Sequence, residues 1–383
     1  MARGRAANQK AGNQKTANQK AEGGINEGMK ATDKKKALKR IAAVIAAELI
    51  LAAAVVWLLD PFYQYHEPFF GLEAVLNDRE NQMAGTIRNF RYDSLLVGSS
   101  VAENFDTEQL NGAYGCNALK VIRASGSMAD LLYYVEMAEE RQELGNIFWC
   151  LDIFAMNASP EVQMFQEGIP RYLYTATPLD DLPYLYNKEI LLEKIPAMIV
   201  SSVKGINTGG AAYNWAADKN FSAEGAMRWY DRPKDAGKDI VKKDPELYRE
   251  AVRENVNMLA GQLAAHPEIQ YRFLVPPYSM LWWDCAWVNG EEEERLYILE
   301  ETLAMLLSFD NTEVYYFQND RDIICNLDNY MDMIHYSPEI NRFMLEEMQK
   351  GNYRLTGENR EAVLEDMRNL VREIHEKEIY RYY

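Results

Sequence analysis

Ser100, Asp332 and His335 are the residue types that acyl-ester chemistry requires. Ser100 stands in Gly98-Ser99-Ser100, between an apolar run and a stretch of helical character. A serine at such a turn is exposed, and the first N–H groups of a helix have no partner within the helix, which suits a developing oxyanion. The sequence therefore indicates a nucleophile. The alternative is a Gly-Ser-Ser that only forms a turn or caps a helix.

His335 is the histidine best placed to act as the base. It follows Asp332 by three residues, so one turn of chain brings the two side chains onto one face. The carboxylate would hold the imidazole tautomer and stabilise the imidazolium that forms when Ser100 loses its proton. The alternative is a loop-capping histidine. Of the other histidines, His66 fits an interfacial or structural role and His266 fits a helix C-terminal cap. His375 fits a solvated face.

Apolar runs alternate with helical patterns over most of the chain. The predicted strands lie at 94–97, 118–124, 146–154, 271–275 and 313–317, and the main predicted helices at 128–144, 245–265, 293–308 and 338–351. Strands that alternate with helices form a parallel sheet with helices on both faces. The predicted fold is therefore a three-layer, flavodoxin-like α/β domain.

Residues 158–243 interrupt this rhythm. They are rich in Tyr, Pro and Gly and have weak periodicity. An insertion at this point leaves the sheet at the carboxyl edge of its strands, where ligand sites form in such folds. We expect either a lid that recognises substrate or an interaction surface.

The same motifs resemble those of the SGNH/GDSL hydrolases over about residues 90–350. The likeness is to membrane-anchored bacterial members with GSS in place of GDS, a branch that includes the D-alanyl-lipoteichoic acid transfer protein and polysaccharide O-acetyltransferases. It implies a triad of Ser100, Asp332 and His335. It also implies that the backbone N–H groups of Ser100 and Gly126 bind the oxyanion.

One motif of that family, GxND, is absent. After the third predicted strand the chain has Asp152 and, five residues later, Asn157. Either stands where the family has its asparagine, but an ionised aspartate cannot donate a hydrogen bond, so Asn157 is the predicted third donor. Loss of one such donor costs about 10²–10³ in rate, which predicts weak hydrolysis if neither residue substitutes.

The N-terminal region has a different character from the rest. Residues 1–40 carry a net charge of +8 and the remainder −25. Residues 1–33 are polar and repeat NQK three times, so residues 1–40 are predicted to form a disordered basic tail. Residues 41–59 are apolar except for Glu48 and are long enough to span a bilayer. Basic residues on the N-terminal side predict a cytoplasmic tail, a transmembrane helix at 41–59 and an extracytoplasmic domain at 60–383.

The charge and the cysteine content narrow the classes of function that the chain could have. An acidic body excludes nucleic acid as a partner. The four cysteines are Cys116, Cys150, Cys285 and Cys325, and they show no CxxC pair and no spacing typical of metal ligands. The sequence therefore implies no metal and no cofactor. We expect an extracytoplasmic serine esterase or O-acyltransferase acting on acyl esters of a cell-surface glycan, with a membrane acyltransferase as a partner implied by the resemblance. The alternative is a catalytically weak scaffold that binds such an acyltransferase or a nascent wall polymer.

Overall fold

A sheet of six strands forms the centre of the protein. The computed structural model describes residues 33–383, apart from 176, 178, 235 and 237–239. The strand order is β2-β1-β3-β4-β5-β6, and only the β5–β6 pair is antiparallel. The chain is thus an α/β protein with a mostly parallel sheet. Its strands are β1 Ser94–Gly98, β2 Ala118–Ile122, β3 Asn146–Cys150, β4 Gln270–Val275, β5 Thr312–Tyr316 and β6 Arg354–Leu355.

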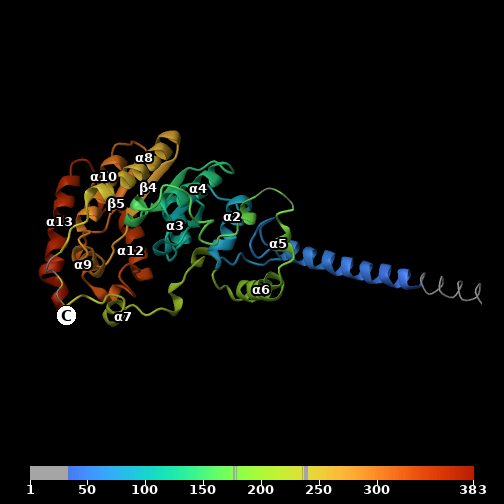
Figure 1. Ribbon diagram of the computed structural model, residues 1–383. Helices are drawn as coiled ribbons and strands as arrows, with labels where there is room; N and C mark the ends of the chain where they lie inside the picture. The colour runs from blue at the N-terminus through green and yellow to red at the C-terminus, as the bar shows by residue number, and fades with distance from the viewer. Residues whose placement is uncertain (1–32, 176, 178, 235, 237–239) are drawn as a thin grey trace, which may run out of the picture.

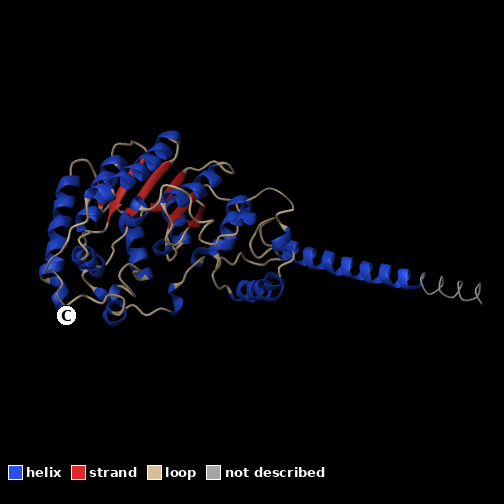
Figure 2. Ribbon diagram, in the orientation of Figure 1, coloured by secondary structure: helices blue, strands red, loops and turns tan. Residues whose placement is uncertain are grey.

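Helices cover both faces of this sheet (Figures 1 and 2). Helix α8 contacts α4 and α10 on one side, while α3 contacts α12 on the other. The helices are α2 Arg79–Asn89, α3 Thr107–Tyr114, α4 Met128–Glu139, α5 Leu182–Leu185, α6 Ile195–Lys204, α7 Ala223–Met227, α8 Arg249–Ala265, α9 Met280–Val288, α10 Glu292–Leu306, α11 Arg321–Ile324, α12 Pro338–Gln349 and α13 Arg360–Glu376.

Local sequence explains why these elements begin where they do. All five residues of β1 are buried, as expected for a parallel strand with helices on both faces. Asp106 caps α3 by accepting the N–H groups of Glu108 and Gln109. Ser127 caps α4 by accepting the N–H of Asp130. Both caps follow the carboxyl ends of neighbouring strands, which is the edge where the candidate site lies.

The five predicted strands are present, but two were predicted too long. The second strand ends at Ile122 rather than at residue 124, and the helix predicted at 128–144 also ends early, at Glu139. The third strand ends at Cys150 rather than at Phe154, because the chain turns at Asp152 into the 3₁₀ helix Ile153–Asn157. The short antiparallel strand β6 and the helices α2, α9 and α13 were not predicted.

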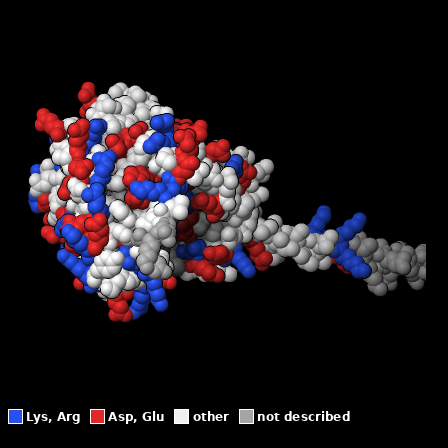
Figure 3. Space-filling model, turned by 60° about the vertical axis from the view of Figure 1, so that its left-hand side comes forward, with Lys and Arg blue, Asp and Glu red and all other residues white. Residues whose placement is uncertain are grey.

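A single long helix, Asp33–Leu59, projects from the domain (Figure 1). It has 27 residues, its apolar window has a mean hydropathy of 2.5, and 6% of that window is buried in the protein. It is therefore long and apolar enough to cross a membrane. Basic side chains gather at the end far from the domain (Figure 3). The helix starts at Asp33, before the predicted span of 41–59, so the prediction of a disordered tail was wrong for residues 33–40. These residues are mostly Lys, Ala and Leu, which favour a helix. Most of the predicted tail, residues 1–32, lies outside the described residues.

The segment between β3 and α8 contains helical turns but no strand within its described residues. Its first part carries Leu173, Tyr184 and Ile195 into a cluster with Val56, near the end of the N-terminal helix. Its second part, around Gly209–Ala211, contacts α3. The predicted insertion at 158–243 therefore connects the N-terminal helix to the region of Ser100.

Candidate active site

Ser100 lies where β1 gives way to the 3₁₀ helix Ser100–Ala102. The strand ends at Gly98, and a Cβ there would lie 2.6 Å from the Cβ of Ala102 and 3.1 Å from the carbonyl oxygen of Cys150. Only glycine fits at so close an approach. The tight turn that results brings Ser99 into the interior and leaves Ser100 partly exposed at the strand end.

Ser100, His335 and Asp332 form one chain of hydrogen bonds. The Nδ1 atom of His335 is 2.7 Å from Oδ2 of Asp332, and Nε2 is 2.8 Å from Oγ of Ser100. Because an ionised carboxylate only accepts, His335 donates through Nδ1 and its Nε2 accepts from the serine hydroxyl. This is the arrangement in which a histidine removes a proton from a serine nucleophile.

The loop that carries Asp332 and His335 differs from the expected helical turn. Oδ1 of Asp332 accepts the backbone N–H groups of Ile334 and His335, at 2.8 and 2.7 Å. The carboxylate thus closes its own turn, as Asp side chains do outside helices. One oxygen of Asp332 fixes the backbone and the other orients the imidazole of His335. The three-residue spacing therefore brings the two side chains together in a turn closed by the Asp332 side chain, and not in a helical turn.

The electrostatic environment keeps Asp332 ionised. Burial by itself would raise its pKa, but hydrogen bonds from the side chain and backbone of His335 and from Ile334 outweigh burial, and the pKa lies below the ordinary value. The side chains of Asp332 and His335 are 15% and 20% exposed. The pair is therefore partly shielded from water, which strengthens its interaction.

Trp215, in the insertion, completes the surroundings of the pair, and no sequence pattern indicated it. Its indole N–H donates to the backbone carbonyl of Ser100 at 2.9 Å. Its ring meets the imidazole of His335 edge to face, with 5.3 Å between the centroids. Trp215 thereby contacts both Ser100 and His335. The only available signal was that the insertion leaves the sheet at the edge where Ser100 lies.

A buried lysine holds this part of the insertion in place. Lys120 on β2 is 2% exposed, and its ammonium group donates to the carbonyls of Glu103, Gly210 and Ala212, at 2.8, 3.2 and 2.6 Å. Burial lowers the pKa of Lys120 to about 7, although nearby carboxylates act in the opposite direction. Lys120 therefore joins the segment after Ser100 to the segment before Trp215.

The predicted oxyanion donors are only partly brought together. No acceptor within the described residues takes the Ser100 N–H. The Gly126 N–H is already used, because it donates to the carbonyl of Arg123 at 2.9 Å and closes a turn. The side-chain amide of Asn157 donates to Glu294 on α10 at 2.8 Å and makes no hydrogen bond to Ser100, Asp332 or His335. Ser100 is thus the one predicted donor that is available, and the arrangement gives no support to Gly126 or Asn157.

Asp152, one of the two residues predicted to take the place of the missing asparagine, lies just after β3. It is fully buried, and one carboxylate oxygen accepts from the hydroxyl of Tyr278. The other oxygen has no hydrogen-bond partner among the described residues. Burial raises the pKa of Asp152 to about 6, against the opposing effects of Tyr278, Ser99 and the charge of His335. Beneath Ser99, the protein thus holds a carboxyl that keeps its proton to a higher pH than an ordinary aspartate.

Replacing Asp152 by asparagine is expected to stabilise the protein more at pH 7.5 than at pH 4.5. The folded-state pKa of about 6 exceeds the ordinary 3.8, so the stability of the wild type falls as pH rises between these values. The pKa shift corresponds to on the order of 3 kcal/mol of unfolding free energy that the wild type loses as pH rises. The variant would not lose it, because its amide stays neutral. Thermal unfolding of the full chain in detergent across this pH range measures the difference. The exposed Asp322→Asn variant is the control, and a difference independent of pH would contradict the assignment.

Several aromatic residues after β4 have structural roles. Tyr278 and Trp283 are fully buried, and the guanidinium of Arg295 lies 3.7 Å from the centroid of the Trp282 ring. Tyr278 and Trp283 thus lie in the core, and the partly buried Trp282 packs against it. His375, predicted to be solvated, is buried instead, and its Nδ1 is 2.8 Å from Oδ1 of Asp284. Its charged neighbours in sequence gave a misleading signal, because only one face of α13 is exposed.

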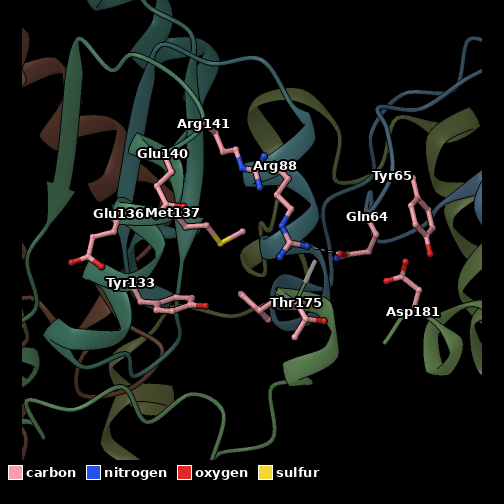
Figure 4. A pocket seen from close by; sticks show the side chains of 11 residues that line it. Gln64, Tyr65, Arg88, Tyr133, Glu136, Met137, Glu140, Arg141, Thr175 and Asp181 are labelled. Carbon is pink, nitrogen blue, oxygen red and sulfur yellow. Dashed lines mark hydrogen bonds between the residues drawn. The ribbon is translucent and has the colours of Figure 1, made fainter. Parts of the chain in front are cut away.

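A cavity of about 410 Å³ lies apart from Ser100, between α2, α4 and the segments near Gln64 and Thr175 (Figure 4). Arg88 projects into it and donates to the Gln64 side-chain oxygen at 3.3 Å. None of the triad residues lines this cavity. In the part of the chain that the structure describes, no three His, Cys, Asp or Glu side chains cluster as metal ligands, and all four cysteines are free.

No protein-family model matches the chain, and no curated protein matches its sequence. The fold and the site therefore carry the functional argument. Together they define an α/β protein in which a partly exposed serine at the end of a strand, a histidine and an aspartate form a continuous hydrogen-bonded chain.

Proposed function

We propose that this protein is a membrane-anchored serine esterase or O-acyltransferase of the SGNH/GDSL type, acting on acyl esters of a cell-surface glycan or wall polymer. The single observation that carries the proposal is the hydrogen-bonded chain Ser100–His335–Asp332. The fold supports it, because the order β2-β1-β3-β4-β5 is that of flavodoxin-like, three-layer folds, with the nucleophile at the carboxyl end of β1.

The geometry supports the following reaction. Oγ of Ser100 attacks the acyl carbonyl while its proton passes to Nε2 of His335, and Asp332 stabilises the resulting imidazolium. His335 then returns the proton to the oxygen of the departing alcohol, and the acyl group remains on Ser100. A water molecule or an acceptor hydroxyl next attacks this acyl-enzyme, with His335 again taking and returning the proton.

The Ser100 N–H supports the tetrahedral intermediate, since it opens a helical turn and has no acceptor among the described residues. A site with one backbone donor stabilises the oxyanion less than a site with three, at a cost of about 10²–10³ per donor. Slow turnover of simple esters is therefore part of the proposal. The same observation favours the second candidate, a weakly catalytic scaffold that binds a membrane acyltransferase or a nascent polymer.

The N-terminal helix supports a location at the membrane. Lys34, Lys35, Lys36, Lys39 and Arg40 lie at its start, and the acidic domain follows its end. Basic residues are retained on the cytoplasmic side of single spans, so the domain and Ser100 would face outward. That orientation gives access to exported polymers.

Covalent labelling of the full chain in detergent by a fluorophosphonate probe tests the proposal. These probes phosphonylate serines that a neighbouring base activates. We expect one adduct per chain, which peptide mass spectrometry would place on Ser100. Turnover of acetyl esters on model glycans would then separate hydrolysis from transfer. A folded protein that never reacts would favour the scaffold.

Replacing Trp215 by phenylalanine is expected to lower ester turnover about two- to tenfold, since it removes one hydrogen bond to the Ser100 carbonyl and keeps an aromatic ring. Trp215→Ala should cost more, because the ring packed against His335 is also lost. Steady-state kinetics on an activated ester measure both. Trp229→Ala is the matched control, because Trp229 lies in the same insertion and is 67% exposed. Equal effects of Trp215→Ala and Trp229→Ala would contradict this role.

A further inference from the structure

Exposed apolar side chains are concentrated near the point where the N-terminal helix enters the domain. Outside that helix, fourteen large hydrophobic residues of the described chain are exposed. Nine of them fall in two segments, the first at residues 69–70 and the second at residues 179–206. The nine are Phe69, Phe70, Leu179, Leu182, Tyr186, Leu192, Val200, Val203 and Ile206. A soluble surface scatters such residues, whereas a concentrated patch marks a contact.

The first segment touches the last turns of the N-terminal helix. Nε2 of His66 lies 2.7 Å from the carbonyl oxygen of Trp57, and the two rings meet edge to face at 5.3 Å. Phe69 stacks on His66 at 3.9 Å, and Phe70 adjoins Phe69 at 6.2 Å. Trp57, Phe69 and Phe70 are 48%, 41% and 75% exposed. Aromatic side chains thus gather just where the apolar helix ends.

The second segment is anchored to the same place through its buried side. Tyr184 and Ile190 pack with Val56 of the helix, and α5 lies beside the helix end (Figure 1). The outward-facing residues of this segment include Leu182 and Leu192, at 47% and 68% exposed. The segment therefore has one apolar side in contact with the helix and another with no partner in the described chain.

The helix joins the domain without a flexible linker. Asp60, directly after the helix, is 1% exposed, and its carboxylate accepts the backbone N–H groups of Gln64, Tyr65 and His66. It also accepts from the hydroxyl of Tyr184 at 2.6 Å. Asp60 thereby joins the helix end to both apolar segments.

We infer that an exit patch, made of Trp57, Phe69, Phe70, Leu182, Tyr186 and Leu192, lies in the interfacial layer of the bilayer that the helix spans. Its occupant is lipid, because the patch continues the apolar surface of the helix. Tryptophan and tyrosine favour this layer, where an apolar ring with a polar edge meets both lipid and water. The patch rests on the proposed membrane anchoring. It adds that the domain is seated on the lipid surface at one height and orientation.

Depth-dependent quenching of a fluorescent label tests the inference on the full chain in liposomes. Cysteines are introduced singly in a Cys116→Ser, Cys285→Ser background, since Cys150 and Cys325 are buried. The patch variants are Phe70→Cys and Leu192→Cys. The control variants are Leu51→Cys, within the apolar helix, and Leu247→Cys, which is 72% exposed next to α8 and away from the helix (Figure 1).

Lipids that carry a quencher near the headgroup should quench the labels at positions 70 and 192 and leave the label at 247 unchanged. Lipids with a quencher deep in the acyl chain should quench the label at 51. If the label at 51 is quenched and the two patch labels are not, the patch inference fails while the anchor stands. Patch labels shielded from aqueous iodide but untouched by lipid quenchers would mean a protein contact, which also overturns the inference. An unquenched label at 51 would instead refute the membrane anchor.

Discussion

Replacing Ser100 or His335 by alanine is expected to lower turnover of an acyl ester by about 10⁴-fold or more and to abolish fluorophosphonate labelling. Ser100→Ala removes the attacking oxygen. His335→Ala leaves a hydroxyl whose proton has no acceptor, because Nε2 of His335 is the group that Oγ contacts, at 2.8 Å. The two residues act as a unit, so the double variant should be little worse than either single variant.

This first prediction is checked by steady-state kinetics and gel fluorescence on the full chain. Ser308→Ala and His266→Ala are the matched controls, because both side chains lie at the surface or near it and contact no member of the triad. Circular dichroism would establish that all variants are folded. Labelling that survives in Ser100→Ala would place the reactive serine elsewhere. Labelling that survives in His335→Ala alone would show that Ser100 is activated without this base.

Replacing Asp332 by asparagine is expected to lower turnover by about 10⁴-fold while the fold is retained. Oδ1 of Asp332 accepts two backbone N–H groups, so the oxygen of the asparagine must keep that position. The amide nitrogen would then face Nδ1 of His335, which at present donates to Oδ2 at 2.7 Å. Two donors cannot face each other, so the imidazole adopts the other tautomer. Its Nε2 then carries hydrogen and cannot accept the proton of Ser100.

The measurement for Asp332→Asn is the pH dependence of turnover and of thermal unfolding, with Asp322→Asn as the control. The pKa of Asp332 is below its ordinary value in the folded protein. Its contribution to stability is therefore present above the ordinary pKa of aspartate and is lost as pH falls through the lowered value. The variant should lack this contribution at neutral pH. Turnover equal to that of the wild type would contradict the role of Asp332 in holding the tautomer.

The chain order of apolar runs was sufficient to predict the parallel part of the sheet. Ser94–Gly98 and Gln270–Val275 are found within a residue or two of their predicted bounds, because a strand buried on both faces must be apolar along its length. The same local reasoning identified the apolar helix before Asp60. Short or amphipathic elements such as Arg354–Leu355 and Arg360–Glu376 were missed, since their signals are weak without a neighbour to pack against.

By itself, the sequence determined the three catalytic candidates, because residue type and local spacing carry that information. Ser100 follows a strand and a glycine, and Asp332 lies three residues before His335. The 235 residues that separate Ser100 from His335 carry no sign that the two side chains meet. That contact follows from the parallel crossovers, which bring the carboxyl end of β1 and the loop before α12 to one edge.

Tertiary structure alone decided which polar groups are available at the site. The Gly126 N–H is used by a turn and the Asn157 amide by Glu294, although each stands at a suitable place in the sequence. Trp215 reaches Ser100 from the insertion, which has no periodicity to predict from. A hydrogen-bonding group has one nearest partner in three dimensions, and that partner depends on how distant segments pack. Local sequence therefore specifies the donors and acceptors, and the packing of distant segments decides where each hydrogen bond goes.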